Sequence, residues 1–159
     1  MNIIGAVGEI PDIETMVGQI SSLEKEHGST IQVFRADRVF GRQHLERAVE
    51  LAQRNWEGGN ASAHTLGMEV MLFAAAERQI DLALEKLGVE KDTKEIAIVV
   101  IGDMNSELIL SELGLSREDR VLGPQGKDHS IFAFTSEELA MADVHELVLE
   151  RMALSQLTR

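Results

Sequence analysis

Glu95-Ile96-Ala97-Ile98-Val99-Val100-Ile101 is the clearest strand in the sequence. After one charged residue it carries six aliphatic side chains in a row, with no polar residue at alternate positions. A strand with one wet face alternates between apolar and polar residues, whereas a strand covered on both faces does not. We therefore expect residues 95–101 to form a buried strand with helices on both sides.

The sequence on either side of this strand alternates between strand and helix patterns. Further strands are expected at residues 2–8, 30–36 and 130–134. Helices are expected at about residues 12–26, 41–56, 65–76, 78–87, 105–113 and from 135 or 136 to about 157. The predicted fold class is therefore α/β (α+β): a small mixed β-sheet packed with several helices, with a helical cluster in the middle of the chain.

Two of the middle helices show where the core lies. On the 41–56 helix one apolar stripe holds Leu45, Ala48, Val49, Ala52 and Trp56. We expect Trp56 to belong to this core stripe, with base stacking as the alternative. The 65–76 helix is apolar all round except for Glu69, which predicts a buried helix. Because a lone buried carboxylate is costly, Glu69 is expected to satisfy a buried Arg or backbone groups.

Length and composition limit the classes of protein. The chain has 159 residues with 44% hydrophobic residues and no internal repeat or proline-rich linker, so residues 1–159 are expected to form one domain. There is no Cys, which excludes disulfides, thiolate metal sites and Cys nucleophiles. No apolar run approaches the ~20 residues of a membrane span, and the N-terminus lacks a signal-peptide pattern. We expect a cytoplasmic protein with no membrane partner.

Charge is unevenly distributed along the chain. The formal net charge of −12 argues against nucleic-acid binding, which is driven by positive charge. Residues 35–54 reverse this locally, because five Arg stand against three acidic residues, a local charge of +2. This arginine island consists of Arg35, Arg38, Arg42, Arg47 and Arg54. Arg suits phosphate recognition, but these side chains could equally pair with neighbouring carboxylates.

Motifs of catalysis and cofactor binding are missing from the sequence. It contains no P-loop, Gly-x-Gly-x-x-Gly or Gly-x-Ser-x-Gly pattern, and its five His are scattered without metal-ligand spacing. Gly5-Ala6-Val7-Gly8 has the Gly-x-x-Gly form of a KH-domain clamp but lies in a predicted strand. We expect no enzyme activity, no cofactor and no metal.

The last predicted helix has two apolar sides. Val144, Leu147, Val148 and Leu154 share one side, which is expected to pack on the protein's own sheet. Leu149, Ala153 and Leu157 recur at four-residue intervals on roughly the opposite side. A second apolar side needs a second cover. We therefore predict that Leu149, Ala153 and Leu157 form a partner interface; a helix enclosed within its own fold is the alternative.

A resemblance to a known family lies in residues 33–88. The first half of it is Val33-Phe34-Arg35-Ala36-Asp37-Arg38-Val39-Phe40-Gly41 with His44-Leu45 and Ala48-Val49. The second half is Gly67-Met68-Glu69-Val70-Met71-Leu72, then Ala74-Ala75-Ala76-Glu77-Arg78-Gln79-Ile80, Ala83-Leu84 and Leu87-Gly88. Together these resemble the small kinase-binding subunit of the KEOPS complex, the TPRKB (PRPK-binding protein) family, in its short archaeal form. The Arg-Gln-Ile element is the most specific part.

The resemblance implies a non-catalytic regulatory subunit. The family's complex transfers a threonylcarbamoyl group to an adenosine of tRNA through a separate catalytic subunit. The small subunit binds and stimulates the kinase-like ATPase subunit, a contact that involves its C-terminal helix. In archaeal members it also captures the 3′ CCA end of tRNA.

The residues themselves suggest where RNA would bind. Arg42 lies at the N-terminus of the 41–56 helix, where backbone N–H groups favour phosphate. The solvent side of the same helix carries Gln43, Arg47 and Arg54. The junction between the next two predicted helices carries Arg78 and Gln79. These six are the predicted tRNA-binding residues. The alternative for Arg78 and Gln79 is a structural junction, with Arg78 paired to an acidic neighbour and Gln79 capping the backbone.

Two other functions stay open at this point. The protein could dock on the kinase-like subunit without touching RNA, as its net charge would permit. It could also be an unrelated small α/β enzyme or ligand-binding protein, although the sequence shows no cluster of titratable residues that would support this.

Overall fold

Strand β3 (Glu95–Ile101) is one of the two inner strands of a four-stranded sheet in the computed structural model, which describes residues 1–157. The strand order is β2-β3-β1-β4, where β1 is Asn2–Val7, β2 is Thr30–Arg35 and β4 is Ser116–Arg117. The register places Ala97 of β3 opposite both Gly5 of β1 and Phe34 of β2. All three pairings are antiparallel, so the expected mixture of strand directions does not occur.

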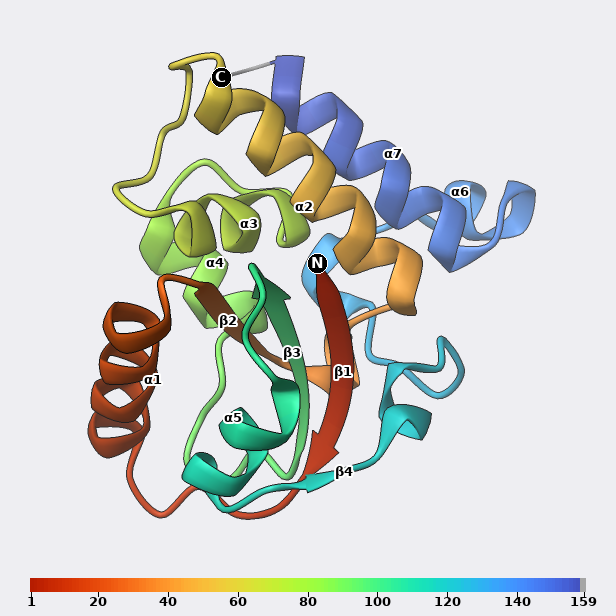
Figure 1. Cartoon of the computed structure of the whole chain (residues 1–159). Helices are drawn as coiled ribbons and strands as arrows, with labels where there is room; N and C mark the ends of the chain where they lie inside the picture. Colours follow the sequence, from red (N-terminus) through yellow and green to blue (C-terminus); the bar gives the residue numbers. More distant parts are fainter. Residues whose placement is uncertain (158–159) are drawn as a thin grey trace.

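Both faces of β3 are covered, as its sequence predicts. Ala97 and Val99 face one hydrophobic cluster, whereas Ile96, Ile98 and Val100 face another. The second cluster lies under α1 (Ile13–His27) and α5 (Ser106–Leu113). The first lies on the other side of the sheet, under the helices drawn in the upper part of Figure 1.

The helices on the first cluster form two layers. α2 (Arg42–Glu57), α3 (Leu66–Ala74) and α4 (Ile80–Leu87) lie next to the sheet. α7 (Val144–Leu157) packs on the outside of α2 and α3, and α2 and α7 run side by side (Figure 1). The apolar side of α7 was expected to pack on the sheet, and this is wrong: two helices separate it from the strands. The mixed α/β class and the central cluster of helices are confirmed.

Local side-chain hydrogen bonds fix several helix ends. Asp12 caps α1 by accepting from the backbone N–H of Thr15, and Thr65 caps α3 by accepting from Met68 N–H. α6 (Ser136–Met141) begins with a capping box between Thr135 and Glu138. Such caps satisfy backbone donors that the first turn of a helix leaves unpaired.

The sequence-based prediction is wrong in two places near the C-terminus. Residues 130–134 form no strand, since Ser130–Phe132 is a short 3₁₀ helix, η3. Its Phe132 is buried in the first cluster, at 6.1 Å from the Phe40 ring, so its apolar character reflects burial without strand pairing. The last helical region is two helices, because Ala142 is extended and Asp143 starts α7 by accepting from Glu146 N–H at 2.9 Å.

Two further short 3₁₀ helices each follow a strand. η1 (Ala36–Arg38) follows β2, and η2 (Asp119–Leu122) follows β4. Neither β4 nor these turns was predicted, because a two-residue strand leaves no periodic pattern in the sequence.

Candidate functional site

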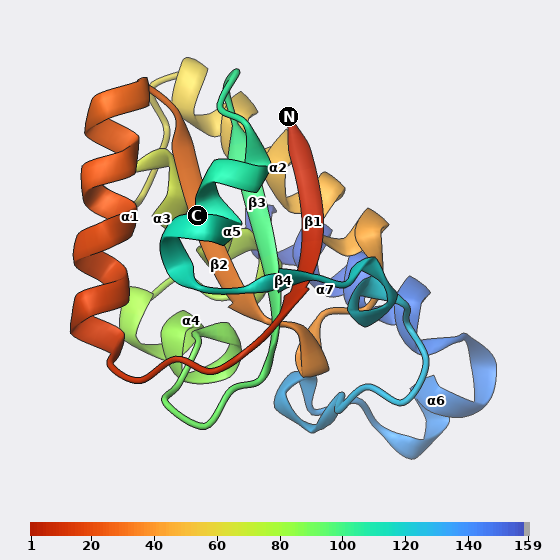
Figure 2. The same cartoon turned by 60° about the horizontal axis from the view of Figure 1, so that its bottom comes forward.

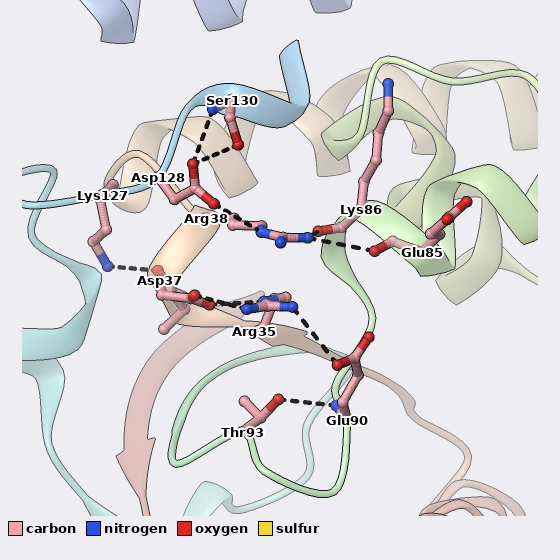
Figure 3. Close-up of polar contacts among 11 residues, drawn as sticks. Arg35, Asp37, Arg38, Glu85, Lys86, Glu90, Thr93, Lys127, Asp128 and Ser130 are labelled. Atoms are coloured by element: carbon pink, nitrogen blue, oxygen red, sulfur yellow. Dashed lines mark hydrogen bonds and ion pairs between the residues drawn. The ribbon is translucent and has the colours of Figure 1, made fainter. Parts of the chain in front are cut away.

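The arginine island divides into an inward and an outward group. Arg35 donates two hydrogen bonds of 2.8 Å to the carboxylate of Asp37, and Glu90 lies 4.0 Å away (Figure 3). Arg38 donates to the backbone carbonyl of Lys86 at 2.8 Å and forms an ion pair with Asp128 at 3.4 Å. These two arginines join β2 and η1 to the end of α4 and to the loop before η3.

Electrostatics explain why this inward group is a structural cross-link. The guanidinium of Arg35 lowers the pKa of Asp37, and hydrogen bonds from Ser130 lower the pKa of Asp128. Both carboxylates therefore stay ionised and neutralise the arginines beside them. Arg35 and Arg38 offer little positive charge to an outside ligand.

The outward group lies along α2. Arg42 is exposed at the first position of the helix, and its guanidinium donates to the carbonyl oxygen of Ile3 at 2.6 Å. Arg47 pairs with Glu50 at 2.8 Å, which matches the carboxylate-pairing alternative for this residue. Arg54 is exposed in the last turn and makes no ion pair with any residue among 1–157.

Gln43 connects α2 to α7 through a histidine. Nε2 of His145 lies 2.8 Å from Oε1 of Gln43, and Nδ1 of His145 donates to the carbonyl oxygen of Phe40 at 2.9 Å. The backbone N–H of Phe40 in turn donates to Nδ1 of His44 at 3.0 Å. His44 Nε2–H donates to the carbonyl oxygen of Ala74 at 2.7 Å. The two histidines therefore fix the start of α7 and the end of α3 to the same residue.

Burial has a clear effect on His44. The side chain is fully buried, and burial lowers its pKa from 6.5 to about 4. A neutral ring fits its contacts, because Nδ1 accepts and Nε2 donates. His44 is thus a structural residue. No sequence pattern indicated this role, because His44 was named only as part of the stretch that resembles the family.

Arg78 and Gln79 lie at the exposed junction between α3 and α4. The chain turns there through Ala76, whose φ of 53° lies in the left-handed region, and Lys86 pairs with Glu77 at 2.5 Å. Gln79 occupies the N-cap position of α4, but its side chain makes no capping hydrogen bond. Its amide group is therefore not used in the way the structural alternative expected.

The predicted partner face of α7 is only partly open. Leu149 is half-buried against the first cluster, whereas Ala153 is exposed and Leu157 is 81% exposed. Leu154 was expected on the inner side and is 47% exposed, because Met152 takes the inner position in that turn. The exposed apolar surface of the last two turns therefore includes Leu154.

Trp56 adds to the exposed apolar residues of this part of the molecule. The expectation of a core Trp56 is wrong, since its side chain is 41% exposed. In its turn of α2 the buried residue is Asn55, whose Nδ2 donates to Glu69 at 3.4 Å. The apolar stripe predicted on the 41–56 helix extends one turn beyond the end of the hydrophobic core.

The predicted RNA and partner residues adjoin each other along α7. Gln43 and Arg47 of α2 line a hollow together with Leu149. Arg78 lines a second hollow with Arg151 and Leu154. The helix α7 is therefore flanked by Gln43 and Arg47 on one side and by Arg78 on the other. Arg151 was not among the residues predicted from the sequence, and its guanidinium also lies over the ring of Phe134, 5.1 Å from the ring centroid.

Comparison with known proteins identifies the family. A family model described as "Kinase binding protein CGI-121" matches residues 11–156. The chain belongs to the CGI-121 family. A search of curated proteins finds no match. Membership of the CGI-121 family makes this a kinase-binding protein, in agreement with the predicted kinase partner.

Residues 1–157 contain no group of three or more side chains that could hold a metal ion. No helix within the same range is long and apolar enough to cross a membrane.

Proposed function

We propose that this protein is the small, non-catalytic subunit of an archaeal-type KEOPS complex, and that it acts in the cytoplasm without a cofactor. In this role it docks on the kinase-like ATPase subunit through α7 and stimulates it. The observation that carries the proposal is the exposed apolar surface at the end of α7, formed by Ala153, Leu154 and Leu157 in a member of a kinase-binding family.

The docking surface is tested with Leu157→Arg. Because Leu157 is 81% exposed, this change should leave the fold intact while placing a charge in the interface. We expect binding to the purified kinase-like subunit, measured by calorimetry, to weaken at least about tenfold. Leu149→Arg should also abolish binding, but half-burial of Leu149 makes it the less selective variant.

The matched control for this experiment is Leu108→Arg on α5. Leu108 is 40% exposed on the opposite side of the sheet, so the same change should leave kinase binding unaltered. Normal binding by a folded Leu157→Arg protein would contradict docking through the end of α7.

We further propose that the protein captures tRNA by its 3′ CCA end, for threonylcarbamoyl-adenosine formation in tRNA. Arg42, Gln43, Arg54, Arg78 and Gln79 are exposed and support this proposal. A few arginines next to amide groups suffice to hold a short single strand through phosphate contacts and base edges. Arg47 stays in the predicted set, although its pairing with Glu50 weakens its contribution.

Filter binding of intact tRNA and of tRNA without its terminal CCA, over a series of salt concentrations, tests this second role. We expect tight, salt-sensitive binding that is lost with the CCA. Equal and weak binding of both RNAs would leave kinase docking without RNA contact, which the net charge of −12 favours.

A further inference from the structure

α1 and α5 lie on the side of the sheet that faces away from α7 (Figure 2). Residues at the start of α1 and the end of α5 line a groove there. We call it the α1–α5 groove, and its volume is about 300 Å³. Ile10, Met16, Leu113 and Leu115 supply its apolar lining, and Asp12 and Glu112 supply its charges. A volume of roughly 300 Å³ is at the lower end of the range for ligand pockets.

The charged groups that line the α1–α5 groove are all negative. Asp12 and Glu112 are carboxylates, and no Lys or Arg lines the groove. Asp12 accepts hydrogen bonds from Thr15, which lower its pKa and keep it ionised.

The end of α5 adds to this negative potential. The helix terminates at Gly114, and its last turn has no basic residue to offset the negative end of the helix dipole. At the start of α1 the opposite, positive end of that helix is already capped by Asp12. The groove therefore combines an apolar lining with two carboxylates, and no Lys or Arg lines it to balance the exposed Glu112.

We propose that the α1–α5 groove binds a peptide segment of a partner protein in which a large apolar side chain stands next to a Lys or Arg. The apolar side chain would lie against Met16 and Leu115, and the cation would lie beside the exposed carboxylate of Glu112 in the last turn of α5. Charge complementarity selects this occupant. A second copy of the chain, with a net charge of −12, would bring further negative charge, and RNA would bring its phosphates.

This surface is independent of the proposed kinase and tRNA contacts. α1 and α5 cover the second cluster, whereas α2, α3 and α7 cover the first, so the sheet separates the two sides. The protein could therefore hold a third partner while α7 is occupied.

The test uses the full chain and a fluorescein-labelled peptide with a central Lys-Leu-Arg sequence flanked by Gly and Ser. Fluorescence anisotropy measures binding, and the NMR signal of the Met16 methyl group reports where the peptide lies. We expect saturable binding that shifts the Met16 signal. A peptide with Glu in place of Lys and Arg, and one with Ser in place of Leu, should each bind at least about fivefold more weakly.

Two charge reversals at helix ends form a matched pair for this test. Glu112→Lys in the last turn of α5 should weaken peptide binding about fivefold or more, because it replaces attraction with repulsion. Glu57→Lys, at the exposed end of α2 on the other side of the sheet, should have little effect. Glu112 is exposed, so its reversal is compatible with folding.

Three results would overturn the proposal. The first is the absence of saturable binding, and the second is an equal loss of binding in the two charge-reversal variants, which would indicate general attraction to an acidic protein. The third is self-association of the pure protein in sedimentation that Glu112→Lys alters, which would make a second copy the occupant. None of these results depends on kinase or tRNA binding.

Discussion

His44 is the residue at which burial has the largest effect on chemistry. Its ring connects Phe40 to Ala74 inside the first cluster, and its burial holds the pKa near 4. Since Phe40 also accepts from His145 of α7, the neutral form of His44 stabilises a contact on which three helices depend.

The lowered pKa of His44 predicts a pH-dependent stability. Above pH 6.5 both the folded and the unfolded chain hold this side chain neutral, so its contribution is fully present. Between pH 6.5 and about 4 the unfolded chain binds a proton and the folded one does not, so the free energy of unfolding falls, by ~3 kcal/mol in total. Urea denaturation over pH 4–7 measures this loss.

His44→Gln is the control for this pH dependence. The variant should lose most of the slope between pH 6.5 and 4, while keeping the loss below about pH 3.8 that comes from Asp37 and Asp128, whose pKa values are lowered. An unchanged slope in the variant would assign the effect to other groups.

Prediction at the level of single residues succeeded where a buried charge had to be neutralised or hydrogen-bonded. Glu69 was expected to satisfy buried groups, and its carboxylate accepts from the backbone N–H groups of Ser62 and Ala63, both at 3.0 Å. Prediction failed at Trp56, because an apolar stripe shows which side of a helix faces inward but not where the core ends.

At the scale of elements, the break between α6 and α7 shapes the proposed docking helix. Ala142 is extended, and the side chain of Asp143 then caps α7. The sequence predicted one continuous helix, in which α7 would have continued along the axis of α6. The direction of α7 therefore depends on the break at Ala142.

Loss of the α7 cap should therefore be measurable. We expect Asp143→Ala to lower the free energy of unfolding by about 1 kcal/mol, because the N–H of Glu146 loses its acceptor. Asp143→Asn retains a capping oxygen and should stay within a few tenths of a kcal/mol of the natural protein. Equal stability of the two variants in chemical denaturation would show that Asp143 does not determine where α7 begins.

Elements with a strong period were predictable, and elements defined by distant contacts were not. β3 and α2 carry their burial patterns in their own residues. Residues 130–134 have the apolar content of a strand, but Phe132 packs against the rings of Phe40 and His44 and the segment pairs with no strand among residues 1–157. That neighbourhood depends on residues some ninety positions away, which no local pattern describes.

At the scale of the whole molecule, the arginine island is not one surface. The sequence placed five arginines close together, but folding turns Arg35 and Arg38 towards Asp37, Lys86 and Asp128. It leaves Arg54 at the end of α2 and brings Arg78 to the edge of α7. The partners of Arg35 and Arg38 at residues 86 to 128 could not be inferred from residues 35–54 alone.

This distribution predicts how tRNA binding responds to salt. If Arg54 and Arg78 each contact one phosphate, the slope of log affinity against log salt should fall by roughly 0.7 for each change to Ala. Arg120→Ala, a highly exposed arginine on η2 that pairs with Glu118, is the control and should leave the slope unchanged. An unchanged slope in Arg54→Ala and Arg78→Ala would remove both residues from the RNA surface.

The strand order also governs how the chain folds as it is synthesised. β1 and β2 emerge early, but each pairs with β3, which lies between them and is made only after residue 94. Until then neither strand has its neighbour, and their apolar side chains have no sheet to join. Pairing between such distant segments is slow and leaves strand edges open. The nascent chain therefore carries β1 without its neighbour through more than half of its translation, and β2 is also unpaired from residue 36 to residue 94. In that interval the exposed strand edges make the chain most dependent on chaperones.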